Sequence, residues 1–240
     1  MLSVNIQPQT SSNRCSVCPT RKACLASNLD DTDLGRLANL IEPFVPITKN
    51  EYLYRVGEPA LRHYHVRSGM FKTHAINTSG DEYVTGFYLP GEILGCAQSV
   101  GKHTDSAVAI ETSTACKLAA NKIPALAEMG VGGTLFRLLG EREDLRNQQL
   151  LNLGQTRADA RIAGFLIDMS NRLVRLGRCP NHIPIPMSRT DIANYLGLSL
   201  ESLSRKLTRM VKAGILSTHR DYIEIIQPEA ISLLGLHTAR

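Results

Sequence analysis

The chain has 240 residues, of which 43% are hydrophobic, so it is long enough for two ordinary domains and too apolar for wholesale disorder. No run approaches the ~20 apolar residues that cross a bilayer, and residues 1–14 have neither the basic nor the apolar region of a secretory signal. We therefore expect a cytoplasmic protein with no membrane partner, in which closely spaced cysteines serve metal or redox chemistry.

The net charge of +5 is concentrated at one end of the chain. Residues 155–240 hold twelve Lys/Arg and seven Asp/Glu, an excess equal to that of the whole chain, so residues 1–154 are neutral. A neutral front and a basic back predict that the C-terminal third meets a polyanion.

A polar segment, residues 1–14, precedes a cluster of cysteines and is predicted to be a loose arm. Cys15, Cys18 and Cys24 fall within ten residues, in a chain that has six cysteines. Thiolates packed this closely require a soft metal or a metal cluster between them. A fourth thiol has to come from elsewhere, and the sequence leaves Cys96, Cys116 and Cys179 as the choices.

A short helix and a run of strands follow. Asp31 or Thr32 is predicted to cap a helix that buries one face and ends at Pro43. From Val45 to about Ala120, short apolar or alternating runs are separated by turn residues, a pattern typical of an antiparallel sandwich or barrel. The runs are EYLYRV, YHVRSG, FKTHAI, EYVTGFYL, SAVAIE and ACKLAA.

The periodicity then becomes helical. From about Gly133 to Leu153, leucines recur near the 3.6-residue repeat, and a helix of this length suits pairing with a second copy. Charged residues interrupt the apolar stripe, so the alternative is a solvated helix that only braces the sheet. We favour the homodimer, with a seam at Leu135, Leu139, Arg142, Glu143, Arg146, Leu150 and Leu153.

The last third has the pattern of a helix-turn-helix with a wing. A helix is predicted from about Arg157 to Leu176, closed by Gly177, and an extended strand or linker over 179–186. Ser188 is predicted to cap a first short helix, and a second runs from Leu200 to Ala213. The first helix ends at a turn where Gly197 permits a left-handed conformation. Two short strands around residues 219–221 complete the wing.

The second helix of such a motif enters the major groove of DNA. Glu201 suits the cytosine amino group, Arg205 can donate two hydrogen bonds to guanine, and Ser204 can reach a base edge or a phosphate. Basic side chains beside them, with the residues at the start of the first helix, suit phosphates. The remaining predicted DNA contacts are Ser188, Arg189, Ser202, Lys206 and Arg209.

These residues resemble the CRP/FNR transcription regulators, and the oxygen-sensing FNR proteins in particular. The resemblance rests on GDEYVTGFYLPGEILG (80–95), ETSTACKLA (111–119), NYLGLSLESLSR (194–205) and the cysteine spacing. It implies an α+β fold with a β-roll, a long dimerisation helix and a winged helix-turn-helix. The implied domains are a cysteine-rich segment (1–28), the β-roll (29–122), the dimerisation helix (123–154) and the DNA-binding domain (155–240).

Carried over by position, the resemblance implies a 4Fe–4S cluster held by Cys15, Cys18, Cys24 and Cys116. It implies that Cys96 and Cys179 are not ligands. Glu201, Ser204 and Arg205 match the recognition pattern of the family, which implies a palindromic DNA site resembling TTGAT-N4-ATCAA. An intact cluster is expected to favour the dimer and DNA binding, and oxygen to reverse both.

The resemblance also bears on other partners. Cyclic-nucleotide-binding relatives place an Arg-Ser pair on the phosphate, whereas this chain has Asp105–Ser106, whose carboxylate would repel it. We therefore expect no cyclic nucleotide. The family further implies contact with RNA polymerase, for which the segment Thr85–Leu94 is a candidate surface.

Three alternatives remain at the level of the sequence. The cysteines could hold a structural Zn, although four-cysteine zinc sites usually use two close pairs, or Cys15 and Cys18 could form a reversible disulfide. An enzyme is not expected, because no phosphate loop, nucleophile elbow or paired metal-binding histidine motif is present. His63 and His65 share one face of a strand, where exposed histidines are more common than a metal site.

Overall fold

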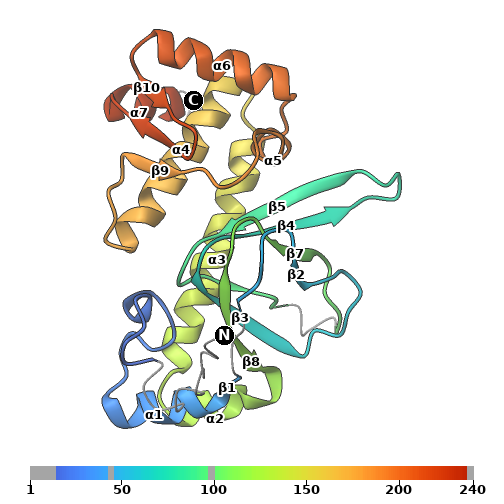
Figure 1. Cartoon of the computed structure of the whole chain (residues 1–240), viewed down its shortest axis with the longest axis vertical. Coiled ribbons are helices and arrows are strands. Elements are labelled where there is room, and N and C mark those ends of the chain that lie inside the picture. Colours follow the sequence, from blue (N-terminus) through green and yellow to red (C-terminus); the bar gives the residue numbers. More distant parts are fainter. Residues whose placement is uncertain (1–14, 43–45, 97–100, 237–240) are drawn as a thin grey trace, which may run out of the picture.

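The computed structural model describes residues 15–42, 46–96 and 101–236, so the predicted loose arm and Pro43 lie outside the described residues. The N-terminal sheets and the C-terminal helices occupy opposite ends of the molecule, and the long helix α3 (Gly132–Leu153) runs alongside both (Figure 1). This arrangement confirms the predicted α+β fold. No helix among the described residues is long and apolar enough to cross a membrane.

The cysteine segment folds as a series of tight turns. The backbone N–H groups of Cys18 and Cys24 donate to the carbonyls of Cys15 and Arg21, around the 3₁₀ turn η2 (Arg21–Ala23). Helix α1 (Asp31–Leu40) follows, and its N-cap is Asp30 rather than Asp31 or Thr32 as predicted. The Asp30 carboxylate accepts a hydrogen bond from the Asp33 backbone N–H at 2.8 Å, which satisfies a free donor of the first turn.

Two four-stranded sheets form the β-roll, with strand orders β1-β8-β3-β6 and β2-β7-β4-β5. All of their strand pairs are antiparallel, as predicted. The six apolar runs of the sequence become β2, β3, β4, β5, β7 and β8, whereas the short β1 and β6 were not predicted. The bounds are β1 (Ile41–Glu42), β2 (Tyr52–Tyr54), β3 (Arg62–Ser68), β4 (Phe71–Ile76), β5 (Glu82–Tyr88), β6 (Ile93–Leu94), β7 (Ser106–Ala109) and β8 (Thr114–Ala119).

The two faces of strand β3 pack against two different hydrophobic cores. Tyr64 and Val66 pack between the two sheets, together with Phe71. Because side chains alternate along a strand, His63 and His65 lie on the other face. They are buried there, at 6% and 5% exposure, so the expectation that they are exposed is wrong. A second core, formed by α1, the cysteine segment and the start of α3, covers this outer side of the sheet.

The helices after the β-roll connect it to the C-terminal part. The turn η4 (Ala120–Lys122) and the short helix α2 (Ile123–Glu128), which were not predicted, lead to α3. With 22 residues, α3 is ~33 Å long. Among its residues only Leu138 is buried. Most of this helix therefore packs against the rest of the protein on one face and exposes the other.

The C-terminal part is a winged helix-turn-helix, as predicted. Ala193 and Leu203 join the two helices of the motif in one apolar core, and Gly197 adopts a left-handed φ of +60° at the turn between them. The third wing strand, β9, lies within the segment 179–186 that was predicted as an extended strand or linker, whereas the terminal helix α7 was not predicted. The elements are α4 (Ala158–Arg175), β9 (His182–Pro184), α5 (Arg189–Tyr195), α6 (Leu200–Lys212), β10 (Leu216–Thr218), β11 (Tyr222–Ile225) and α7 (Pro228–Leu236).

Candidate functional site

The four cysteines expected to act as ligands line a single cavity of about 40 Å³. The turns of the cysteine segment supply Cys15, Cys18 and Cys24, and strand β8 supplies Cys116. Cys15 is buried and the other three are half-buried. Cys96 and Cys179 do not line this cavity, and Cys179 is exposed. Within the described ranges, no group of three or more His, Cys, Asp or Glu side chains is arranged to hold a metal ion.

The wall of this cysteine cavity is mostly apolar. A few polar groups reach the sulfurs: the Ala26 N–H donates to Cys24 Sγ at 3.4 Å, and the Thr20 hydroxyl lies 3.2 Å from Cys18 Sγ. An apolar wall excludes water, and N–H donors stabilise negative charge on sulfur. The apolar lining residues are Leu25, Ala26, Leu37, Ala38, Ile41, Val66 and Leu118.

The protonation of the thiols follows from this environment. Burial, with a smaller contribution from the neighbouring thiols, raises the pKa of Cys24 to about 11 and that of Cys116 to about 12. The thiols of Cys24 and Cys116 therefore stay protonated at neutral pH, because burial in a dry cavity disfavours the charged thiolate. A soft metal group offers the positive charge that would replace these protons, so the donor set fits one.

The cysteine segment is also packed against the rest of the protein. Ala23 lies against the turn at Gly91, which has a φ of +91°, and a Cβ on Gly91 would come within 2.7 Å of the Ala23 Cβ. On its other side, Cys15 shares a core with Leu138 of α3, and Leu135 packs on that core. The position of the cysteine segment is thereby coupled to the N-terminal half of α3.

An exposed line of side chains runs along α3 with spacings of three and four residues. Phe136, Leu139, Leu150 and Leu153 are 81%, 38%, 67% and 37% exposed. Glu143 and Arg146 occupy the same line and are also exposed. Phe136 was not among the predicted seam residues, although its spacing from Leu139 and Glu143 was visible in the sequence.

Two predicted seam residues lie on the inner side of α3 instead. Leu135 packs on the core beside the cysteine segment. Arg142 extends toward the β-roll, where Tyr88, Cys96 and Tyr54 hold its pKa above the ordinary value despite its burial. Sequence spacing alone did not separate these inward positions from the outward ones.

Arg142 also lies close enough to Asp105 of the β-roll to affect its charge. Burial raises the pKa of Asp105 there, and the charge of Arg142 counteracts that shift. The Tyr54 hydroxyl donates to Asp105 at 3.3 Å, and its ring stacks on His103 with the centroids 3.8 Å apart. Side chains of this chain therefore occupy that part of the β-roll.

The outer face of α6 presents the predicted base-reading residues. Glu201, Ser204 and Arg205 are exposed, and Arg205 lies 3.3 Å from Glu201 in an (i, i+4) pair. Ser199 caps the helix by accepting a hydrogen bond from the Ser202 N–H at 3.1 Å. Ser202 itself is half-buried. Helix α6 lies at the end of the molecule opposite the cysteine segment (Figure 1).

The residues predicted to contact phosphates differ in their exposure and in the contacts that they already make within the chain. Arg209 is exposed, whereas Lys206 lies 3.8 Å from the Asp159 carboxylate of α4. The Ser188 hydroxyl donates to Asp191 at 2.7 Å in the capping box of α5. Arg189 lines a groove between α6 and the wing, and partial burial lowers its pKa.

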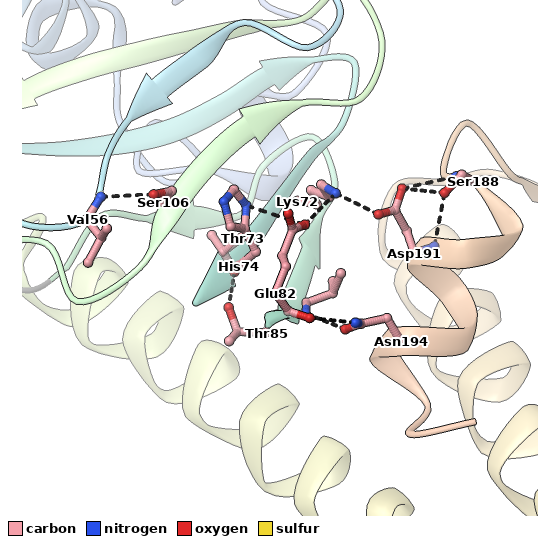
Figure 2. Close-up of polar contacts among 11 residues, drawn as sticks. Val56, Lys72, Thr73, His74, Glu82, Thr85, Ser106, Ser188, Asp191 and Asn194 are labelled. Atoms are coloured by element: carbon pink, nitrogen blue, oxygen red, sulfur yellow. Dashed lines mark hydrogen bonds and ion pairs between the residues drawn. The ribbon is translucent and has the colours of Figure 1, made fainter. Parts of the chain in front are cut away.

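The helix-turn-helix is fastened to the β4–β5 hairpin by a polar contact (Figure 2). Lys72 Nζ lies 2.6 Å from Asp191 and 2.9 Å from Glu82. The Asn194 amide donates to the Glu82 carbonyl and accepts from the Val84 N–H, both at 2.7 Å. We call these five residues the hairpin latch. A sequence pattern gives no sign of it, because its members come from two domains.

A buried arginine makes a second connection between the same two parts. Arg172 of α4 is 4% exposed and donates to both oxygens of Glu92, at 2.8 and 2.7 Å. It also donates to Asp168 at 3.0 Å and to the Phe87 carbonyl. The β-roll therefore extends into the DNA-binding part as one packed unit.

The segment Thr85–Leu94, expected to face RNA polymerase, is mostly buried. Within it only Thr85 is exposed, because Phe87, Tyr88 and Leu89 pack inward. The expectation that this segment forms a surface is wrong.

Two protein-family models and several known regulatory proteins match this chain. A Crp-like helix-turn-helix domain matches residues 160–234, and a cyclic nucleotide-binding domain matches residues 44–129. The fumarate and nitrate reduction regulatory protein of Salmonella typhi is 34% identical over 93% of this chain and 91% of its own length. The protein of the same name from Escherichia coli K12 is 33% identical over the same shares.

A solved structure agrees with these relatives. FixK2 from Bradyrhizobium japonicum is 28% identical, with a TM-score of 0.72 over 80% of this chain and 96% of its own. The relatives are transcription regulators and not enzymes, as the absence of catalytic motifs had indicated.

Proposed function

The chain belongs to the CRP/FNR family of DNA-binding transcription regulators, and from this premise we propose that it responds to oxygen through a 4Fe–4S cluster. The observation that carries the proposal is the single cavity lined by Cys15, Cys18, Cys24 and Cys116. Four thiols in an apolar, enclosed wall are the donor set of such a cluster. When bound, the cluster supplies an oxygen-labile link between the cysteine segment and strand β8.

The residues of the chain connect this site to dimerisation. Holding Cys116 and the cysteine segment together fixes the core in which Leu135 and Leu138 of α3 are packed. We propose that this core sets the position of the exposed line from Phe136 to Leu153, along which two copies pair. Glu143 and Arg146 on that line would each approach their own counterpart, so the monomer–dimer balance is easy to shift by a few kcal/mol.

The same dimer would place two copies of α6 about one turn of DNA (~34 Å) apart on a palindromic site. Glu201, Ser204 and Arg205 are proposed to contact bases of a TTGAT-N4-ATCAA-like sequence, with Ser202, Arg209 and, at the start of the first helix, Ser188 and Arg189 on the backbone. Lys206 is proposed to exchange its Asp159 contact for a phosphate. Such a regulator acts where DNA is, in the cytoplasm.

We propose further that no cyclic nucleotide is the signal. Asp105 would repel a phosphate, and it already interacts with Tyr54 and Arg142 of this chain. The cyclic nucleotide-binding domain would then serve as a scaffold for the cysteine cavity and for α3.

The test is an iron and acid-labile sulfide assay on anaerobically purified protein, with binding to a TTGAT-N4-ATCAA duplex measured before and after air. The proposal expects a brown protein with iron and sulfide, which loses its colour and its DNA affinity together in air. Cys116→Ser should lose both, and Cys179→Ser, at an exposed cysteine outside the cavity, should keep both. A colourless wild-type protein that contains zinc, or a redox response that survives removal of iron, would contradict the cluster.

A further inference from the structure

His65 lies beside the proposed ligand Cys116, on the neighbouring strand. The two residues are directly paired in the antiparallel register of β3 and β8. Directly paired residues point to the same face of a sheet, with Cβ atoms about 4.5–5.5 Å apart. His65 also lines the cysteine cavity. Its ring therefore faces the same enclosed space as the four thiols.

The ring of His65 is buried without a hydrogen-bond partner. Its exposure is 5%, and among the described residues neither Nδ1 nor Nε2 finds a donor or acceptor. A buried polar group in this condition costs stability unless a partner is supplied. Leu or Val would fill the same position of the strand without that cost, so the ring needs a partner that the free chain does not provide.

We propose that His65 donates a ring N–H hydrogen bond to a sulfur of the iron–sulfur group bound in the cysteine cavity, at or next to Cys116. This inference rests on the proposed function. His65 is a positioning residue and not a ligand, because four cysteines already complete the donor set of a 4Fe–4S cluster. An imidazole carries at least one N–H in each of its protonation states, so the donor is present in all of them.

The hydrogen bond would supply the partner that His65 lacks and stabilise negative charge on the Cys116 side of the site. Hydrogen bonds to sulfur tune the reduction potential of such clusters, and partners of metal ligands strongly affect metal affinity. Arg67, two residues further on the same strand, also lines the cavity and lowers the pKa of Cys116. Strand β3 therefore offers donors and positive charge to the one ligand that lies outside the cysteine segment.

His63 is a matched control. It lies on the same strand and the same face as His65, is 6% exposed, and its two ring nitrogens are also without a partner among the described residues. It does not line the cysteine cavity. A general effect of replacing a buried histidine of β3 should appear at both positions, whereas a bond to the cluster should appear only at His65.

The experiment compares His65→Leu, His65→Gln and His63→Leu in the full chain, reconstituted anaerobically with Fe²⁺ and sulfide. Resonance Raman spectra in H₂O and D₂O report N–H···S bonds through the Fe–S stretching frequencies, and a chelator challenge reports iron retention. His65→Leu should shift these frequencies, reduce the D₂O effect and release iron about tenfold faster. His65→Gln, which keeps an N–H donor, should restore part of each, and His63→Leu should match the wild type.

The thermal stability of the metal-free protein distinguishes this role from a purely structural one. If His65 only supported the fold, His65→Leu would lower the stability of the metal-free protein. His65→Leu removes two unsatisfied nitrogens, so the metal-free variant should melt no lower than the wild type. If His65→Leu does not fold, His65→Phe retains a ring and removes the same nitrogens.

Three results would overturn the inference. One is an iron-loaded His65→Leu whose Raman spectrum and iron retention equal those of the wild type and of His63→Leu. Another is a directly coordinated histidine nitrogen, detected as strong ¹⁴N coupling in the reduced cluster. The third is a wild-type protein without iron and sulfide, which is the failure of the proposed function and is seen before any variant is made. A brown wild type with an unchanged variant defeats the inference about His65 alone.

Discussion

At the scale of single residues, Arg205 is the side chain that we propose distinguishes one base from another. It is exposed on α6 and lies 3.3 Å from Glu201. We predict that Arg205→Ala weakens binding to the palindromic site by ~1–3 kcal/mol and relaxes specificity at the guanine position. Competition binding with duplexes substituted at single positions measures both effects.

Lys212 provides the comparison for Arg205, since it is exposed at the end of the same helix and suits a phosphate. Lys212→Ala should weaken binding to all sequences equally and reduce the salt dependence by about one unit of slope. An Arg205→Ala protein that behaves in this uniform way would show that Arg205 contacts only the backbone.

Arg172 carries the largest expected effect of a single residue on stability. Its buried guanidinium pairs with Glu92 and Asp168, and removing it would leave two partly buried carboxylates without their positively charged partner. We predict that Arg172→Met lowers the free energy of unfolding by ~3–5 kcal/mol, measured by urea denaturation of the metal-free protein. A loss below that range would indicate that Glu92 and Asp168 become hydrated in the variant.

At the scale of elements, the hairpin latch joins β4 and β5 to the first helix of the helix-turn-helix (Figure 2). The side chains of Lys72 and Asp191 are only 16% and 18% exposed, so loss of Lys72 leaves a largely buried Asp191 without its positively charged partner. We predict that Lys72→Met costs ~1–3 kcal/mol and speeds amide hydrogen exchange in α5. Arg62→Met, which removes the exposed pair with Glu42, should cost less than ~1 kcal/mol.

The latch also has a predictable dependence on pH. Burial opposes the charge of Asp191, but Lys72 and Ser188 hold the pKa of this carboxyl below its ordinary 3.8. The contribution of Asp191 to the stability of the folded protein is therefore complete above pH 3.8. It is lost as the pH falls through the lower pKa of the folded state. Asp191 and Glu82 raise the pKa of Lys72 above 10.5. The contribution of Lys72 to the stability of the folded protein is therefore complete below pH 10.5 and is lost as the pH rises through the higher pKa of the folded state.

The stability difference between the wild type and Lys72→Met tests this dependence. It should be constant near neutral pH and shrink below pH 3.8, as followed by thermal denaturation across a pH series. A difference that already changes between pH 6.5 and pH 3.8 would implicate His74, whose pKa burial lowers from 6.5 and whose Nδ1 lies 4.0 Å from Glu82.

At the scale of the whole molecule, the exposed line on α3 predicts how two copies associate. Four apolar side chains on this line would be covered in the dimer, whereas Arg146 would meet its own counterpart across the two-fold axis. We predict that Arg146→Leu tightens the dimer at least about tenfold, or ~1.4 kcal/mol, even without metal. Sedimentation equilibrium of the metal-free protein measures the change.

Arg137→Leu is the control for Arg146→Leu, because Arg137 lies on α3 away from the exposed line and pairs with Glu141. It should leave the monomer–dimer constant unchanged. Equal effects of the two substitutions would mean that added surface hydrophobicity, and not the seam, drives association. A weakened dimer in Arg146→Leu would mean that Arg146 pairs with an acidic residue of the other copy.

The sequence by itself determined most of the elements and singled out the four cysteines of the candidate site. Periodicities of two and of 3.6 residues predicted six of the strands, α3, α4 and the winged helix-turn-helix, because those patterns follow from local geometry. Resemblance to a known family selected Cys116 from three candidates, and the structure brings it to the same cavity as Cys15, Cys18 and Cys24.

Only the tertiary structure decided which side chains face each other across the chain. It turned Leu135 and Arg142 of α3 inward and left Phe136 outward. It also buried His65 against the cysteine cavity, where sequence alone favoured exposure. The physical reason is that a sequence pattern assigns a residue to a face of an element, whereas the element packed against that face depends on long-range contacts.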